Sequence, residues 1–142
     1  MRLFIALPLP PEYQDGLLQI QNHFKGRLNS KMSWTKKGNW HVTLKFLGEV
    51  EEGAVAGIVS SLEGVGRSFN MQAGGGGFFP SKKKPRVLWA GLLLGAEQVA
   101  ALAENVEKRL VPLGFEAEKR TFRPHLTLAR IKWAKQDDWS AV

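Results

Sequence analysis

The sequence contains no cysteine and no long apolar run. Without cysteine the chain can form no disulfide, thiolate nucleophile or cysteine-ligated zinc site, and it suits a reducing cytoplasm, where we expect it. A membrane-spanning helix needs about 20 apolar residues in a row, so we expect no membrane association. The apolar start is short and interrupted by Pro8, Pro10 and Pro11, and we interpret it as a first strand, not as a signal peptide.

Acidic residues are fewer than basic ones. The chain has 13 Asp and Glu against 20 Lys and Arg, which gives a formal net charge of +7. A positive surface attracts polyanions such as nucleic acid, with an affinity that falls as salt rises. The same charge can serve solubility alone, so it does not decide between these two roles. The length of 142 residues and the 44% hydrophobic fraction predict a single globular domain over 1–142.

Hydrophobic patterns predict an α+β fold in which one order of elements occurs twice. Each half has a strand, a helix with one apolar stripe, and a strand that begins with His-x-Thr. We interpret the repetition as a weak internal duplication that forms two half-lobes facing each other across a central cleft. The predicted strands are 2–7, 33–35, 40–47, 87–94 and 125–131, and the predicted helices are 11–28, 51–65 and 99–110.

Two details of this pattern concern the first helix and a run of four glycines. The apolar stripe of the first helix is Tyr13, Leu17, Ile20, Phe24 and Leu28. The run Gly74–Gly77 is followed by Phe78, Phe79 and a basic segment, and we predict a loop there, not a domain boundary.

The residues that point to chemistry form two short motifs, His41-Val42-Thr43 and His125-Leu126-Thr127. Side chains alternate between the two faces of a strand, so each histidine shares a face with the threonine two residues on. By the same alternation Lys45 joins the face of His41, while Phe46 points to the opposite face. Each strand is therefore expected to present an imidazole and a hydroxyl together.

Two imidazoles suit the hydrolysis of a phosphodiester. The reaction needs a base that takes a proton from water and an acid that protonates the departing oxygen, and histidine titrates near neutral pH. Thr43 and Thr127 can donate hydrogen bonds to the phosphate, and Lys45 can add positive potential. No set of three metal ligands surrounds either motif, so we expect no metal and no other cofactor. His23 has no partner motif and is assigned to the surface or to packing.

If only one motif were present, we would interpret its histidine as a structural residue at a strand edge, hydrogen-bonded to nearby polar groups, and not as a catalytic residue. Two motifs with the same spacing, each at the head of a predicted strand, favour the catalytic interpretation over that one.

At these residues the chain strongly resembles the two-histidine (2H) phosphoesterase superfamily, and within it the bacterial and archaeal RNA 2′,3′-cyclic phosphodiesterases, also described as 2′-5′ RNA ligases. The resemblance covers nearly the whole chain. It is carried by Arg2–Ala6, Asn39–Gly48, Pro85–Gly91 and Phe122–Arg130, in the order of that family.

The resemblance implies a bilobal α+β fold with antiparallel sheets lining a basic cleft, and we expect the helices on the outer faces. It implies that His41 donates a proton to the leaving 3′ oxygen and that His125 activates water, so that an RNA 2′,3′-cyclic phosphate end becomes a 2′-phosphomonoester. The ligase name implies a related joining reaction, but we expect hydrolysis to dominate because water is abundant. Family members continue for some tens of residues after the second motif, so we expect this chain to lack their C-terminal strand.

Candidate contacts with RNA lie near the motifs. Arg123 shares the face of His125 by parity, whereas Arg130 needs a bulge to reach that face and otherwise forms a salt bridge or a solvated surface. Phe4, Trp40 and Phe46 are expected in the core, and one of them, or Phe78 or Phe79, is a candidate for stacking on a base.

Two other functions stay open. One is hydrolysis of another small cyclic phosphate by the same histidines, and the other is a non-catalytic module that binds RNA ends. The expected partners are RNA with 2′,3′-cyclic phosphate ends or small cyclic nucleotides, and we expect a monomer with no obligate protein partner.

Overall fold

The computed structural model describes residues 1–26, 31–80, 85–119 and 122–133, and within these ranges it shows an α+β fold with three α-helices and two antiparallel sheets. This confirms the predicted fold class. The expectations for Leu28 and for residues 134–142 lie outside the described ranges. No helix in the described part is long and apolar enough to cross a membrane.

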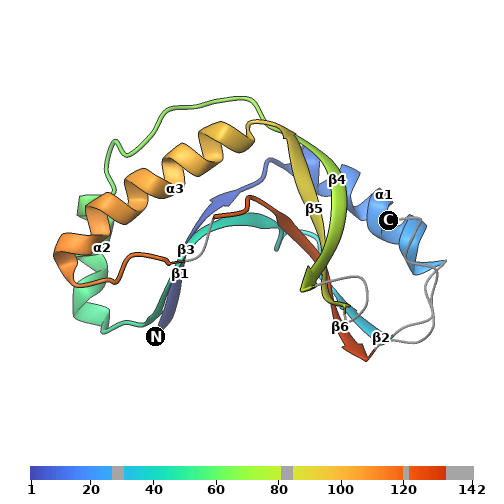
Figure 1. Ribbon diagram of the computed structural model, residues 1–142, viewed down its shortest axis with the longest axis horizontal. Coiled ribbons are helices and arrows are strands. Elements are labelled where there is room, and N and C mark those ends of the chain that lie inside the picture. The colour runs from blue at the N-terminus through green and yellow to red at the C-terminus, as the bar shows by residue number, and fades with distance from the viewer. Residues whose placement is uncertain (27–30, 81–84, 120–121, 134–142) are drawn as a thin grey trace.

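The strands form two sheets of unequal size, as counted over the described residues. The smaller sheet pairs β1 (Arg2–Pro8) with β3 (His41–Glu49). The larger has the order β2-β6-β5-β4. Its strands are β2 (Lys31–Trp34), β6 (Leu126–Trp133), β5 (Pro85–Leu94) and β4 (Gln72–Pro80). In Figure 1 the two sheets form one curved arch, with β3 and β6 meeting near its middle.

The predicted repetition is visible in the order and pairing of the elements. The first half runs from β1 through α1 (Pro11–Lys25) to β3, and β1 pairs with β3 antiparallel. The second half runs from β5 through α3 (Ala96–Leu110) to β6, and β5 pairs with β6 antiparallel. Each His-x-Thr strand is therefore paired with the strand that opens its own half.

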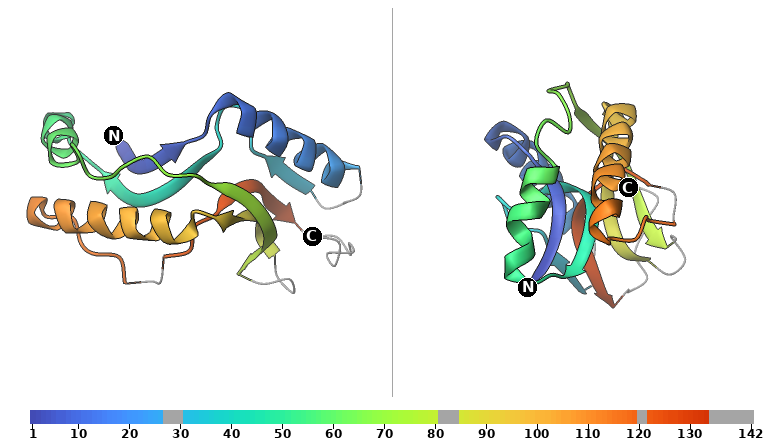
Figure 2. Two further views of the ribbon diagram at one scale, coloured as in Figure 1. Left: turned by 90° about the horizontal axis from the view of Figure 1, so that it is seen from above. Right: turned by 90° about the vertical axis from the view of Figure 1, so that its left-hand side faces the viewer.

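The helices, in contrast, are exchanged between the halves. Helix α1 begins after Pro10 and has a proline in its first turn. From this helix, Tyr13 donates a hydrogen bond to the carbonyl oxygen of Met71, the residue before β4. In α3, Glu107 forms an ion pair with Lys45 of β3. Figures 1 and 2 show the two helices at opposite ends of the molecule. Each helix thus packs on the sheet that contains the His-x-Thr strand of the other half.

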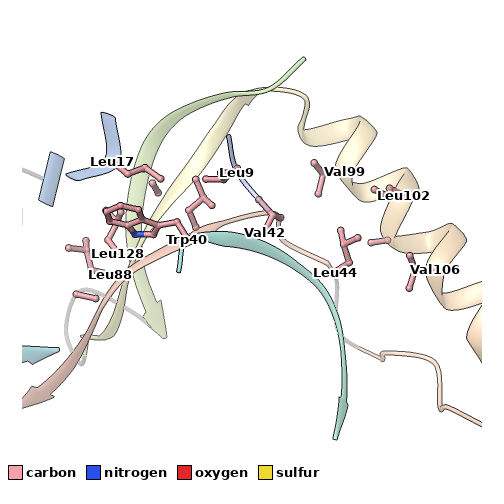
Figure 3. Close-up of a cluster of buried hydrophobic side chains, with 14 of the residues drawn as sticks. Leu9, Leu17, Trp40, Val42, Leu44, Leu88, Val99, Leu102, Val106 and Leu128 are labelled. Carbon is pink, nitrogen blue, oxygen red and sulfur yellow. The ribbon is translucent and has the colours of Figure 1, made fainter. Parts of the chain in front are cut away.

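The core continues from one sheet to the other. Val42 and Leu44 of β3 point toward the apolar face of α3. Trp40, just before β3, lies with Leu17 of α1 and Leu128 of β6 at the other end of the cluster (Figure 3). The labelled core residues on α3 are Val99, Leu102 and Val106. Because this cluster runs through both halves, its burial stabilises their contact.

The buried face of α1 differs from the predicted stripe. The structure buries Gln14, Leu17 and Gln21, whereas Tyr13 and Ile20 stay substantially exposed. The helix is therefore rotated so that Leu17 remains central while two glutamines replace two of the expected apolar positions. An apolar stripe alone predicts that both amides are exposed, since burial of a polar amide is favourable only where it finds hydrogen-bond partners. Such partners cannot be identified from the stripe.

The second predicted helix is shorter than expected. Of 51–65, the structure forms a 3-10 turn, η1 (Glu52–Ala54), and α2 (Val55–Ser61). Gly53 lies in η1, and Gly64, with a φ of +65°, lies beyond the end of α2. Both stand outside the helix, which a glycine weakens by about 1 kcal/mol relative to alanine.

The glycine run is a strand, not the predicted loop. Gly74–Gly77 lies inside β4, where the pairing with β5 is irregular between Ala73 and Gly76 and where Gly75 has a φ of +69°. A Cβ on Gly77 would lie 2.7 Å from Cζ2 of Trp89 on β5, so the missing side chain makes room for that indole ring. The glycines permit a bulged strand to lie flat against large side chains.

We predict that Gly77→Ala lowers the free energy of unfolding by about 2 kcal/mol, the usual scale for overpacking a filled site. Urea unfolding measures this value. Gly57→Ala is the matched control, because the Cβ that it adds within α2 has no atom within 4 Å apart from its chain neighbours and the backbone of its own helix. There the same change should stabilise the protein by about 0.5–1 kcal/mol. Equal effects at the two positions would contradict the packing assigned to Gly77.

Candidate active site

Both motif histidines are held by the same local hydrogen bond. Nδ1 of His41 lies 2.9 Å from the Asn39 carbonyl oxygen, and Nδ1 of His125 lies 2.7 Å from the Arg123 carbonyl oxygen. In each case the partner is the backbone two residues upstream. A carbonyl oxygen can only accept, so the Nδ1 atom must carry the hydrogen. The Nε2 atom of each ring is then the one that takes or gives a proton.

The threonines two residues on accompany the histidines as expected. His41 and Thr43 are both half-buried, and so are His125 and Thr127, while Val42 between the first pair is buried. The alternation confirms that each imidazole shares a face with a threonine. His125 lies immediately before β6, which begins at Leu126.

Each imidazole also packs against one or two aromatic rings from other strands. Phe4 of β1 stacks on His41 with ring centroids 4.9 Å apart and planes 25° apart. Phe79 of β4 meets the ring of His125 edge-on at 5.1 Å, and Trp89 of β5 does so at 6.5 Å. These rings restrict the orientation of the imidazoles. The sequence indicated Phe4 as a core residue or base-stacking candidate and Phe79 as a base-stacking candidate, and their contact with the histidines followed only from the strand pairing.

A bulge occurs at the same place in both motifs. In the pairing of β3 with β1, Thr43 lies opposite Ala6 and Lys45 opposite Ile5, so one residue of β3 has no partner. In β6 the residue skipped in the pairing with β5 is Leu128. In both strands the extra residue is thus the leucine that follows the motif threonine, Leu44 or Leu128, and the side chains after it change faces.

Because of the bulge, Lys45 does not lie on the face that strict alternation predicts. The expected shared face with His41 is wrong, because Lys45 lies on the buried side together with Leu44. Its Nζ donates at 2.7 Å both to Oε1 of Glu107 and to the Glu116 carbonyl oxygen. The lysine therefore ties β3 to α3 and does not extend toward a ligand beside His41.

The same shift brings two other predicted residues to the histidine faces. Phe46 is 74% exposed, and its ring lies 6.1 Å from that of Phe4, which stacks on His41. Arg130 is exposed and, counted across the bulge, lies on the same face of β6 as Thr127. The bulge that Arg130 needed in order to reach that face is present. The side chain of Arg123 is exposed just before the second motif.

The other candidates lie away from these faces. Trp40 and Phe78 are buried in the core. His23 is exposed on α1 and contacts only its neighbour Phe24 among the described aromatic rings, which confirms its assignment to surface and packing. No group of three or more His, Cys, Asp or Glu within the described ranges is arranged to hold a metal ion.

A hollow of about 300 Å³ lies on the far side of β6 from His125. Its wall includes Leu17 of α1, Leu92 of β5 and Leu126, which points away from the imidazole beside it. The lining is almost entirely apolar, so the hollow does not suit a phosphate.

A model of the LigT-like phosphoesterase family matches residues 7–89 and 94–142. The chain belongs to the LigT-like phosphoesterases. This confirms the resemblance to the two-histidine enzymes that the motifs indicated. Both motifs of this LigT-like chain lie within the matched ranges.

Three similar proteins agree with the family. A curated relative from Aeropyrum pernix, named RNA 2′,3′-cyclic phosphodiesterase, is 40% identical over 105 residues, which are 73% of this chain and 60% of that relative. A protein of the same name from Geobacillus stearothermophilus is 32% identical over 92% of this chain and 41% of its own length. The crystal structure of TT0787 from Thermus thermophilus has 28% identity and a TM-score of 0.81, covering 97% of this chain and 79% of that one. This LigT-like chain therefore spans less than two thirds of the two curated relatives.

We predict that Glu107→Gln lowers the free energy of unfolding by about 2 kcal/mol, because it leaves the buried ammonium of Lys45 without its anion. Thermal or urea unfolding measures the change. The control is Glu104→Gln on the same helix, which removes a solvent-exposed pair with Lys108. That change should stay within about 0.5 kcal/mol. A loss at Glu107 no larger than at Glu104 would argue against a structural role for Lys45.

Proposed function

We propose that this LigT-like phosphoesterase is an RNA 2′,3′-cyclic phosphodiesterase that hydrolyses 2′,3′-cyclic phosphate ends to 2′-phosphomonoesters. The observation that carries the proposal is the matched presentation of His41 and His125. Each has Nδ1 fixed by a backbone carbonyl oxygen and a threonine on the same strand face. Two such sites on contacting strands supply both proton-transfer groups that the reaction needs. The names of the curated relatives support the choice of RNA as substrate.

In the proposed reaction, water attacks the phosphorus of the cyclic phosphate. Nε2 of His125 accepts a proton from that water, and the bond between phosphorus and the 3′ oxygen breaks. His41, protonated at Nε2, gives its proton to the departing 3′ oxygen. The products are a free 3′ hydroxyl and a 2′-phosphate, and the two imidazoles have exchanged protonation states. The same groups account for the related 2′-5′ joining reaction when a 5′ hydroxyl takes the place of water. Nε2 of His125 takes the proton of that hydroxyl, the 5′ oxygen bonds to phosphorus, and the 3′ oxygen leaves with the proton of His41, which gives a 2′-5′ phosphodiester and a free 3′ hydroxyl.

The substrate phosphate is held by Thr43 and Thr127, whose hydroxyls donate to its non-bridging oxygens as negative charge grows there. Arg130 stands on the Thr127 face and suits a further contact with the phosphate, and exposed Arg123 suits the RNA backbone. Phe46, exposed beside Phe4, suits stacking on a base. Lys45 is left out of the set because its ammonium is already paired inside the protein.

We also propose that residues 1–142 act as one domain, since neither half covers its own sheet without the helix of the other. A cytoplasmic enzyme without a cofactor fits the cysteine-free sequence and the two-imidazole chemistry, and we propose that it acts as a monomer. The net charge of +7 favours RNA over an uncharged partner. Comparing turnover of nucleoside 2′,3′-cyclic phosphates with that of other cyclic phosphodiesters separates RNA-end hydrolysis from the alternative substrates.

We predict that His41→Ala and His125→Ala each reduce kcat for a nucleoside 2′,3′-cyclic phosphate by at least about 10²-fold, because each removes one proton-transfer step. Binding of RNA ends should persist in both variants. The control is His23→Ala, an exposed change on α1 that should leave kcat unaltered. Phosphorus NMR of the product should show the 2′-phosphomonoester. Near wild-type turnover in either motif variant defeats the proposed roles, and binding without turnover in the wild-type protein favours a non-catalytic module.

We predict that EDTA changes turnover by less than about twofold and that the rate depends on pH as a bell-shaped curve. At low pH the base is protonated, and at high pH the acid has lost its proton, so both limbs fall. Steady-state rates measured with and without chelator over the pH range provide the test. Loss of activity in EDTA with recovery on adding a divalent ion would count against catalysis by the two imidazoles.

A further inference from the structure

The buried face of α1 carries two amide side chains among apolar residues. Gln14 is 6% exposed and Gln21 is 1% exposed, with Leu17 between them. Along the described residues, only Lys45 is also charged or polar and buried to this degree. An unpaired buried amide is costly, so an apolar residue would serve packing better unless the hydrogen bonds have a purpose.

Gln14 binds the backbone around the first motif. Its Nε2 donates at 3.4 Å to the carbonyl oxygens of Leu9 and Trp40, and its Oε1 accepts from the N–H of Gly38 at 3.0 Å. Trp40 immediately precedes His41, and Leu9 follows the strand residue that pairs with His41. One amide therefore holds both backbone segments that flank the first imidazole.

Gln21 binds the backbone of the second motif. Its Nε2 donates to the carbonyl oxygen of Leu128 at 2.9 Å and to that of Thr35 at 2.7 Å. Leu128 is the bulge residue that follows Thr127. Thr35 in turn donates from Oγ1 to the Thr127 carbonyl oxygen at 2.8 Å and from its N–H to the Leu128 carbonyl oxygen. The amide thus fixes the bulge that orients the second motif.

The two amides belong to one rigid helix. Seven residues span two turns, so the two attachment points are about 10 Å apart along the axis. The strands that carry the motifs belong to different sheets and share no ladder of hydrogen bonds with each other. Displacing a catalytic group by about 1 Å can reduce the rate by about 10²-fold, so a link of fixed length between the two strands matters for the reaction.

We propose that Gln14 and Gln21 are positioning residues, through which α1 fixes the separation and orientation of His41 and His125. The proposal rests on the proposed two-histidine reaction. It assigns the glutamines no contact with substrate. Their effect is on the rate of the chemical step and not on substrate binding.

The first test is Gln21→Met, which keeps the length and removes the donors. We expect kcat for a nucleoside 2′,3′-cyclic phosphate to fall by about 10- to 100-fold while KM changes by less than about threefold. Leu17→Met is the control for disturbance of the same buried face, and Gln19→Met is the control for loss of an exposed glutamine. Urea unfolding of each variant gives the folded fraction, and both controls should retain kcat per folded molecule within about twofold.

The second test is the coupling of Gln21 with His125. If the amide acts by placing the base, its loss matters little once the base is absent. In a His125→Ala background, Gln21→Met should therefore reduce the residual rate by less than about threefold. A glutamine that only stabilises the fold would give the same fractional loss in both backgrounds.

Thr35→Val is the alternative variant if Gln21→Met does not fold. It is nearly isosteric and removes only the hydroxyl bond to Thr127, and kcat should fall by at least about threefold at unchanged KM. The inference is overturned if Gln21→Met, or Thr35→Val in its place, keeps the kcat per folded molecule of Leu17→Met. In that event a loss of at least about 10²-fold in His41→Ala and His125→Ala leaves the proposed function standing. Retained activity in those histidine variants defeats the proposed function itself.

Discussion

The exchange of helices between the two halves is the constraint on which the rest of the structure depends. A two-stranded sheet is marginal alone, and the sheet of β1 and β3 is covered by α3 from the second half. The larger sheet is covered by α1 from the first half. Folding of either half therefore needs the other. The two His-x-Thr strands are brought into contact by the same packing that stabilises the core.

The repeated bulge determines which side chains lie on the same strand face as the two histidines. Without it, strict alternation would direct Lys45 toward the ligand side and bury Phe46 and Arg130. With it, the ammonium of Lys45 is available for Glu107, and an aromatic ring and a guanidinium are presented beside the histidines. The recurrence of one bulge at the same motif position shows that the two halves use a common local solution for displaying an imidazole and a hydroxyl together.

Local patterns were sufficient to predict the α+β class, the repeated order of elements and the pairing of each histidine with a threonine. They failed where a long-range contact decided the outcome. The glycine run became a strand through its pairing with β5, on which the indole of Trp89 occupies the space beside Gly77. The face of Lys45 followed from a register shift against β1. The buried amides of Gln14 and Gln21 were missed because their carbonyl partners lie on segments distant in sequence.

The central claim is that both imidazoles act on one phosphate group. A crystal structure of the protein with a nucleoside 2′-monophosphate tests it most directly, through the distances from the phosphate oxygens to the two Nε2 atoms. We expect Nε2 of His41 and Nε2 of His125 both to lie within about 3.2 Å of a phosphate or ribose oxygen at the reacting centre. A phosphate held by one histidine, with the other imidazole out of reach, would contradict the claim.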